Sequence, residues 1–223
     1  MMSWLKERIL NWFQFLALRI IKAGEVPKHV AFIMDGNRRY IKKQGGKERR
    51  HVKGCDKLFE MTNHCKNLGI TEITFYTFSI ENFKRSKEEV DELMDFLKQK
   101  FKYYIEEKEE LMNDGICIRV IGNLSLVPED LYKVIAEIMI ITRENNEIVY
   151  NFALAYTCKY NYNEPYLCLH LILYITLRLR SGRMKLITDC LYTYKSPNPD
   201  LLIRTSGETR LSDFLMWQVR KRI

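Results

Sequence analysis

The stretch HVAFIMDGNRRY, residues 29–40, decides the fold class of this chain. Its first six residues form a short, largely apolar run rich in Val, Ile and Phe, which predicts a buried β-strand. The turn signal Asp35-Gly36-Asn37 then ends this strand. Further strands of the same kind are predicted over residues 73–78, 116–121, 148–155 and 201–205. The chain therefore carries short buried strands separated by much longer segments.

Amphipathic helical patterns occupy several of the segments between these strands. They cover residues 53–67, 87–113 and 128–145, and Pro128 in the first turn of the last one is a typical helix start. Strands that alternate with long helices predict a mostly parallel sheet with helices on its faces. We therefore expect a single α/β domain over residues 25–223.

Size and composition limit the classes of protein to which the chain can belong. With 223 residues, 47% of them hydrophobic, it can bury a sizeable core, which excludes disorder as its main state. The formal net charge of +8 favours a polyanionic partner, such as nucleic acid, an anionic membrane surface or a phosphorylated small molecule. Six cysteines without a C-x-x-C pair indicate a reduced, cytosol-facing compartment.

Residues 1–24 combine apolar and aromatic side chains with charged ones. Lys6, Glu7, Arg8 and Arg19 make the segment too charged for a transmembrane span, and it lacks a signal-peptide cleavage site. Two interpretations stay open for this predicted amphipathic helix. It lies at a membrane interface, or it docks on the domain's own core.

Three of the predicted strands end in clusters of polar and basic residues. In a parallel sheet, ligands bind beyond the carboxyl ends of the strands, so these clusters are candidate binding sites. In the first, Asp35 can hold Mg²⁺, and the turn at Gly36 and Asn37 offers backbone N–H groups to a phosphate. Arg38 and Arg39 add bidentate contacts to phosphate oxygens. Taken alone, this cluster could also be a plain strand-turn-helix connection with solvated arginines.

The other two clusters can complete such a site. Residues 79–85 supply Asn82 and Arg85, although a helix start with exposed charges would look the same. Further on, Arg204 and Arg210 stand around a Ser-Gly bend and Ser212 follows, which suits a diphosphate more than an ordinary surface loop. Three basic strand ends in one sheet are difficult to explain as an accident.

Four stretches resemble the signature blocks of the cis-prenyltransferase family in their order and spacing. They are HVAFIMDGNRRY (29–40), FYTFSIENFKRSKEEV (75–90), IRVIGN (118–123) and DLLIRTSGETRLSDFLMWQ (200–218). The RRY that follows Asp-Gly-Asn and the SIENFKR block resemble the eukaryotic dehydrodolichyl diphosphate synthase branch more closely than the bacterial undecaprenyl branch.

This resemblance implies an enzyme that condenses isopentenyl diphosphate in cis onto an allylic primer such as farnesyl diphosphate, with Mg²⁺ as cofactor. The product would be a long-chain polyprenyl (dehydrodolichyl) diphosphate for dolichol and protein glycosylation. The resemblance also implies a heteromer with a Nogo-B-receptor-type subunit. This complex would make peripheral contact with the cytosolic face of the endoplasmic reticulum membrane.

The resemblance further implies a role for each residue that matches a family motif. Asp35 would bind Mg²⁺ and the diphosphates, with Asn82 and Arg85 completing the catalytic site. The allylic diphosphate would be held by Gly36, Asn37, Arg38 and Arg39. Isopentenyl diphosphate would be held by Arg204, Arg210 and Ser212, and His51 and Glu208 would assist. Because a growing apolar product must leave water, we also expect a hydrophobic tunnel lined by the helices near residues 87–113.

The chain departs from the family pattern in four places. Lys47 and Arg50 stand where the family has an arginine and a glycine in the loop before His51. Residues 158–188 are atypical, and we hypothesise a frame-shifted or mis-spliced exon there. The chain also stops five residues after Gln218, where the family continues. These features predict a C-terminally truncated catalytic domain.

Two other functions are compatible with parts of the sequence. A truncated chain could be a catalytically impaired isoform that acts as a binding subunit. A nucleic-acid-binding domain is suggested only by the net charge, and Lys and Arg are scattered instead of massed among aromatic residues. We therefore expect no nucleic-acid partner.

Overall fold

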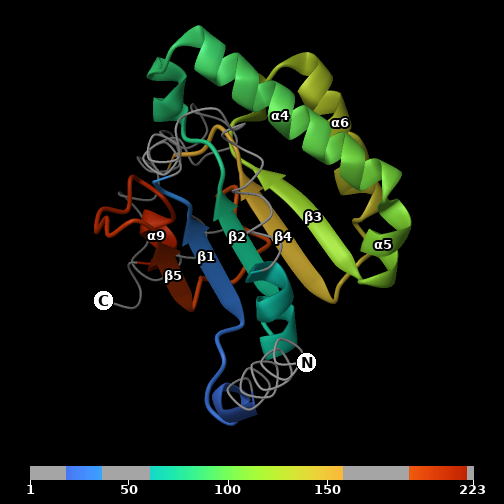
Figure 1. Cartoon of the computed structure of the whole chain (residues 1–223), viewed down its shortest axis with the longest axis vertical. Helices are drawn as coiled ribbons and strands as arrows, with labels where there is room; N and C mark the ends of the chain where they lie inside the picture. Colours follow the sequence, from blue (N-terminus) through green and yellow to red (C-terminus); the bar gives the residue numbers. More distant parts are fainter. Residues whose placement is uncertain (1–18, 37–60, 158–190, 220–223) are drawn as a thin grey trace, which may run out of the picture.

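A computed structural model describes residues 19–36, 61–157 and 191–219 of the chain. Within these ranges the strands are β1 (His29–Ile33), β2 (Glu72–Tyr76), β3 (Ile116–Ile121), β4 (Ile148–Ala153) and β5 (Leu201–Arg204). They form a five-stranded sheet in the order β3-β4-β2-β1-β5, and every neighbouring pair is parallel (Figure 1). The prediction of an α/β fold with a parallel sheet is thus confirmed.

The longest helices cover one face of this sheet. The longest are α4 (Lys87–Glu106) and α6 (Glu129–Ile141), which lie together beside β3 in Figure 1. The shorter elements are η1 (Ile80–Lys84), α5 (Lys108–Asn113), η2 (Leu124–Leu126) and α9 (Met216–Val219). Residues 19–22 and 61–68 are also helical, the latter inside the segment predicted as a helix over 53–67.

Two helix boundaries differ from the sequence prediction. The helix expected over 87–113 is two helices, because Glu107 leaves helical geometry with φ −91° and ψ 28°. The helix expected over 128–145 ends at Ile141, and Pro128 caps it instead of lying in its first turn. At the carboxyl end, the Thr142 hydroxyl donates to the Ile138 carbonyl at 2.9 Å and accepts the Ile118 N–H at 3.0 Å. The helix therefore ends where a side chain bonds both to it and to the neighbouring strand.

Two strands also differ from their predicted bounds. The strand expected over 73–78 spans Glu72–Tyr76, and the one expected over 148–155 ends at Ala153. Ala155 adopts a positive φ of 48°, a conformation that does not continue a strand. The apolar pattern continues past the strand end because Leu154, Ala155 and Tyr156 are all buried.

The sheet separates two hydrophobic clusters. The larger one joins the face under α4 and α6 to those helices, and its most buried members include Ile73, Phe75, Ile118, Ile135 and Ile138. The smaller one lies around Ala31, Ile33, Tyr156, Phe214 and Leu215, so the carboxyl-terminal segment covers the strand ends. This second cluster supports the loop that follows β5.

A buried polar network lies among the first residues of the strands. His29 Nδ1 is 2.8 Å from the Pro197 carbonyl oxygen, and His29 Nε2 is 2.7 Å from Thr74 Oγ1. Because a carbonyl can only accept, Nδ1 carries the proton and the Thr74 hydroxyl donates to Nε2. Desolvation lowers the pKa of His29, and this effect outweighs the opposing influence of Glu72, the Pro197 carbonyl and Asp200. His29 therefore joins β1, β2 and the segment before β5 as a neutral side chain.

Several predictions concern residues outside the described ranges. Most of the predicted amphipathic helix 1–24, the atypical segment 158–188, and the candidate site residues Asn37, Arg38, Arg39 and His51 belong to this group. The described helices include none with the length and apolar character needed to cross a membrane. The division into an N-terminal helix and a catalytic domain stays a prediction.

Candidate active site

The order of the strands brings the three polar clusters to one edge of the sheet. β1 lies between β2 and β5, and the registers pair Ile33 with both Tyr76 and Arg204. Because all strands are parallel, the segments that follow β1, β2 and β5 leave the sheet on the same side. From β1 the chain proceeds through β2 to β3 at one edge of the sheet, and after β4 it crosses to β5 at the other edge, so β1 and β5 are neighbours although they are far apart in the sequence.

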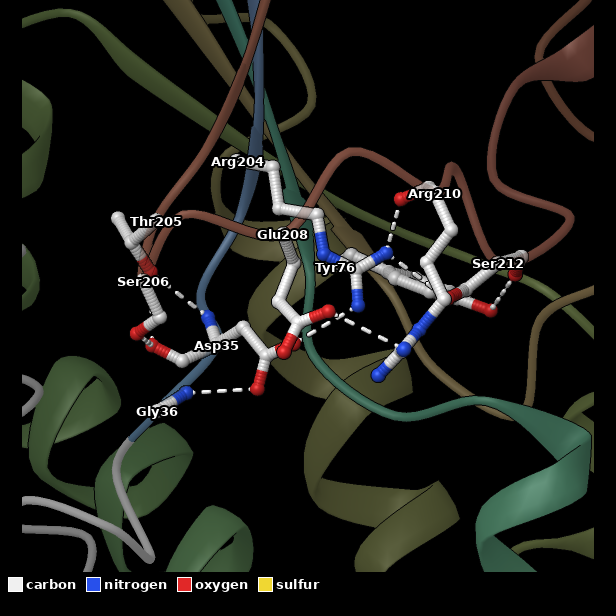
Figure 2. Close-up of polar contacts among 9 residues, drawn as sticks. All are labelled: Asp35, Gly36, Tyr76, Arg204, Thr205, Ser206, Glu208, Arg210 and Ser212. Atoms are coloured by element: carbon white, nitrogen blue, oxygen red, sulfur yellow. Dashed lines mark hydrogen bonds and ion pairs between the residues drawn. The ribbon is translucent and has the colours of Figure 1, made fainter.

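The centre of the site is an ion pair between the residues that follow β1 and end β5. Arg204 Nη2 donates to Asp35 Oδ2 at 2.7 Å (Figure 2). The Arg204 side chain is 8% exposed and that of Asp35 is 31% exposed. Two residues separated by 169 positions therefore converge, as the sequence analysis expected for the acidic group and the arginines.

Two hydroxyl groups that follow β5 hold the backbone of Asp35. The Thr205 hydroxyl lies 2.8 Å from both the N–H and the carbonyl oxygen of Asp35. The Ser206 hydroxyl donates to the same carbonyl oxygen at 2.7 Å. The Asp35 carboxylate also accepts the Gly36 N–H through Oδ1 at 2.6 Å. The position of the carboxylate is thus determined by the end of β5 as well as by β1.

Gly36 is required by this close approach of the two strand ends. Its φ is +90°, and a Cβ added to it would lie 1.8 Å from Ser206 Oγ. A side chain at this position would therefore push Ser206 away from Asp35.

The loop after β5 is shaped by Arg204 and Tyr76. Arg204 Nη1 donates to the Ser212 hydroxyl at 2.8 Å and to the Arg210 carbonyl oxygen. The Tyr76 hydroxyl donates to the Ser212 carbonyl at 3.1 Å, and its ring stacks on Phe214 with centroids 4.4 Å apart. These contacts hold a loop in which Ser206, Ser212, Asp213 and Leu215 all have positive φ, a conformation that is costly without such support.

The outer part of the site is an ion pair between Glu208 and Arg210. Their side chains approach to 3.1 Å, and the Arg210 side chain is 67% exposed (Figure 2). An exposed pair of this kind contributes little to stability, about 0–1 kcal/mol. Arg210 can therefore exchange its carboxylate partner for a phosphate at small cost.

Asn82 and Arg85 follow β2, and their observed contacts are local. The Asn82 side chain accepts the Ser79 N–H at 3.1 Å and so caps η1. Arg85 pairs with Glu89 at 3.1 Å, with both side chains partly buried. A catalytic role for either residue stays a prediction.

Two features of the site suit an anionic ligand and a hard metal ion. Arg204 Nε is buried and has no hydrogen-bond partner among the described residues, although Nη1 and Nη2 of the same guanidinium both donate hydrogen bonds. The described residues contain no cluster of three or more His, Cys, Asp or Glu side chains that could enclose a metal. Mg²⁺ is usually held by one or two carboxylates together with substrate phosphates, and Asp35 provides such a carboxylate. The donor set therefore fits Mg²⁺ that arrives with a diphosphate.

The roles of Thr205, Ser206 and Tyr76 could not be predicted from the sequence. The two hydroxyl residues lie inside a quoted motif, but their bonds to Asp35 span about 170 positions and leave no local signal. In the sequence, Tyr76 is indistinguishable from any other aromatic residue of a predicted buried strand. Its contact with the Ser212 carbonyl is a property of the folded chain only.

Comparison of the sequence with known proteins finds a matching family and similar relatives. Residues 33–222 match the family model described as "Putative undecaprenyl diphosphate synthase". The human dehydrodolichyl diphosphate synthase complex subunit DHDDS is 48% identical over 225 residues, which cover 97% of this chain and 66% of the human protein. The chain thus spans slightly less than two thirds of this relative.

A more distant sequence relative and a solved structure are also similar to this chain. The tritrans,polycis-undecaprenyl-diphosphate synthase (geranylgeranyl-diphosphate specific) of Pyrococcus furiosus is 38% identical, covering 91% of this chain and 77% of its own length. The crystal structure of lavandulyl diphosphate synthase from Lavandula x intermedia, in complex with dimethylallyl diphosphate, superposes with a TM-score of 0.74 and 31% identity. The superposed part covers 86% of this chain and 83% of the lavender chain.

Proposed function

Because this chain belongs to the undecaprenyl diphosphate synthase family of cis-prenyltransferases, we propose that it condenses isopentenyl diphosphate in cis onto an allylic diphosphate. The observation that supports this proposal most directly is the Asp35–Arg204 pair at the carboxyl ends of β1 and β5. It combines a metal-binding carboxylate with a guanidinium that keeps one free donor. Farnesyl diphosphate is the primer we propose, and the product is a long-chain dehydrodolichyl diphosphate.

The residues of the site divide between the two substrates in this proposal. Asp35 holds Mg²⁺ and, with the turn at Gly36 and Asn37, receives the allylic diphosphate, which Arg38 and Arg39 also contact. Mg²⁺, when bound, offsets the negative charge that develops on the departing diphosphate. Arg204, Arg210 and the Ser212 hydroxyl bind isopentenyl diphosphate.

The double bond of isopentenyl diphosphate then attacks the allylic carbon from which diphosphate departs, and a proton leaves the adduct. Four further residues assist this condensation in our proposal. Asn82 and Arg85 approach the diphosphates from the end of β2, Arg85 by exchanging Glu89 for a phosphate. His51 and Glu208 assist at the edge of the site. The apolar product grows into a tunnel along α4, whose inner side chains Leu93, Met94, Leu97 and Phe101 are buried.

We further propose the setting in which the chain works. The human relative is named as a subunit of a complex, which supports a heteromer with a Nogo-B-receptor-type subunit. Peripheral attachment to the cytosolic face of the endoplasmic reticulum membrane would place the apolar product beside the bilayer that receives it.

Incorporation of radiolabelled isopentenyl diphosphate into apolar product tests this proposal. The parent chain is assayed with farnesyl diphosphate and Mg²⁺, with and without the Nogo-B-receptor-type partner, beside Asp35→Ala, Asp35→Asn and the exposed control Asp95→Asn. Asparagine can still accept from Arg204 but lacks the charge, so we expect folded protein with at least about 100-fold lower turnover. Parent-like turnover by Asp35→Asn would refute the site. A parent that binds farnesyl diphosphate without turnover in both settings would favour the binding-subunit alternative.

A further inference from the structure

A large cavity lies along β3, away from the residues of the proposed active site. Its volume is about 860 Å³, and it is bounded by β3, by the start and outer side of α6 and by residues 192–196. β3 is the outermost strand on this side of the sheet (Figure 1). A cavity beside an edge strand can accept groups that complete the strand's hydrogen bonds.

The direction of the β3 backbone shows which groups face the cavity. Leu154 N–H donates to the Ile121 carbonyl and Ile148 N–H to the Gly115 carbonyl, so odd-numbered residues of β3 bond to β4. Successive residues alternate, which directs the backbone of Ile118 and Val120 toward the free edge.

Among the described residues, side chains bond to one half of this edge. Thr142 Oγ1 accepts the Ile118 N–H at 3.0 Å, and Asn145 Nδ2 donates to the Ile116 carbonyl at 2.8 Å. Within the described part of the chain, the Ile118 carbonyl and both backbone groups of Val120 have no hydrogen-bond partner. Val120 is only 5% exposed, and a backbone group so little hydrated normally has a partner. The Ile118 carbonyl and the N–H and carbonyl of Val120 therefore lie one after another along the edge, where the backbone of an added strand could bond to them.

A second unpaired group lies in the same cavity. Asn151 of β4 is fully buried, and its Nδ2 donates to Glu72 Oε1 at 2.6 Å, to Thr74 Oγ1 at 3.1 Å and to Ser196 Oγ at 3.3 Å. Its Oδ1 has no partner. Asn151 lines the cavity, which therefore offers a further buried acceptor.

The two walls of the cavity differ in chemistry. The wall toward α6 is largely apolar and includes Leu124, Val127, Tyr132 and Met139. On the opposite face of β3, Arg119 donates to the Lys195 carbonyl at 3.5 Å, and both side chains line the cavity. Neither forms an ion pair with any residue in the described ranges. The wall toward α6 is therefore mainly apolar, with Ser125, Glu129 and Arg143 also among its lining residues, whereas Arg119 and Lys195 give the other wall a positive charge.

We propose that β3 binds an extended segment of a partner protein in which acidic and apolar residues alternate. The segment adds a short strand beside Ile118–Gly122, as in other complexes that extend a sheet at its edge. Its side chains point alternately to the two faces of the sheet. Apolar ones meet the α6 wall, and carboxylates meet Arg119 and Lys195. This interface is separate from the site that follows β1 and β5, so it does not depend on the proposed activity.

Fluorescence anisotropy with labelled octapeptides tests this inference. The probes are (Glu-Val)₄, the charge-inverted (Lys-Val)₄ and the non-alternating Glu₄-Val₄. We expect only (Glu-Val)₄ to bind and to slow hydrogen exchange at the Val120 amide. Arg119→Glu and Lys195→Glu should each weaken its binding about tenfold, whereas the exposed control Lys102→Glu on α4 should not change it.

Four results would contradict strand addition at β3, and each can be distinguished from the others. Equal binding of (Glu-Val)₄ and Glu₄-Val₄ would show a charged surface without strand addition. Binding that persists in the Arg119→Glu/Lys195→Glu double variant would place the contact elsewhere. The proposal would be overturned if (Glu-Val)₄ does not bind. It would also be overturned if anionic phospholipid vesicles displace the peptide and so remove the slowed hydrogen exchange at the Val120 amide. Circular dichroism of each variant confirms that it is folded.

Discussion

Replacing Gly36 with alanine should separate the ends of β1 and β5 and so test how the candidate site is built. The added Cβ would lie 1.8 Å from Ser206 Oγ and 2.9 Å from Ser206 Cβ. A left-handed backbone conformation costs a non-glycine residue about 1–2 kcal/mol. Relief of the overlap adds about 1–3 kcal/mol. We therefore expect Gly36→Ala to lower the free energy of unfolding by about 2–5 kcal/mol.

A second substitution separates the two parts of this loss. Ser206→Gly removes both atoms that the new Cβ would strike, and it also suits the positive φ of 73° at that position. It should restore about 1–3 kcal/mol to Gly36→Ala, the part that comes from the overlap. The remaining loss comes from the backbone of residue 36, which the second substitution leaves unchanged.

Urea unfolding followed by circular dichroism measures this double-mutant cycle in four proteins: the parent, the two single variants and the double variant. The same proteins in the incorporation assay should lose kcat/KM with Gly36→Ala, because Asp35 moves with its neighbour. A coupling energy below about 0.5 kcal/mol would contradict the reasoning, since non-interacting sites are additive within that range. So would a Gly36→Ala protein as stable as the parent.

Two further predictions concern residues that support the site. Tyr76→Phe removes the hydroxyl that holds the Ser212 carbonyl, so KM for isopentenyl diphosphate should rise about three- to tenfold, with about 1 kcal/mol of stability lost. Tyr103→Phe, at an exposed position on α4, is the control, and an unchanged KM in Tyr76→Phe would exclude the positioning role. His29 has its pKa lowered by burial, so the unfolded state binds more protons, and stability should fall as the pH decreases below the ordinary histidine value of 6.5. Urea midpoints across this range should show a flatter pH dependence for His29→Gln than for the core variant Ile138→Ala, and equal slopes would disprove the assignment.

Much of the fold could be predicted because its signals are local. A short apolar run before Asp35, repeated along the chain and separated by amphipathic helices, is enough to predict a parallel sheet. The boundaries that differed were set by contacts between distant parts. Thr142 ends α6 because its hydroxyl also bonds to Ile118 of β3, and Ala155 turns the chain although it continues an apolar pattern.

The candidate site was predictable to a similar degree. Asp35, Arg204 and Ser212 have side chains whose chemistry suits diphosphate and metal, and each follows or ends a predicted strand. Thr205 and Ser206 were not assigned, because a hydroxyl near a strand end has many uses. Their function of holding Asp35 is visible only when β1 and β5 are paired.

The amino-acid sequence alone determined the fold class and the side chains available at the strand ends, because apolar periodicity and residue chemistry are properties of short segments. Only the tertiary structure decided that β5 pairs with β1. That pairing brings Arg204 to Asp35, and the strand order leaves β3 at the other edge of the sheet that the described strands form. Strand order depends on the sum of many contacts between residues far apart in the chain, and no single segment carries that sum.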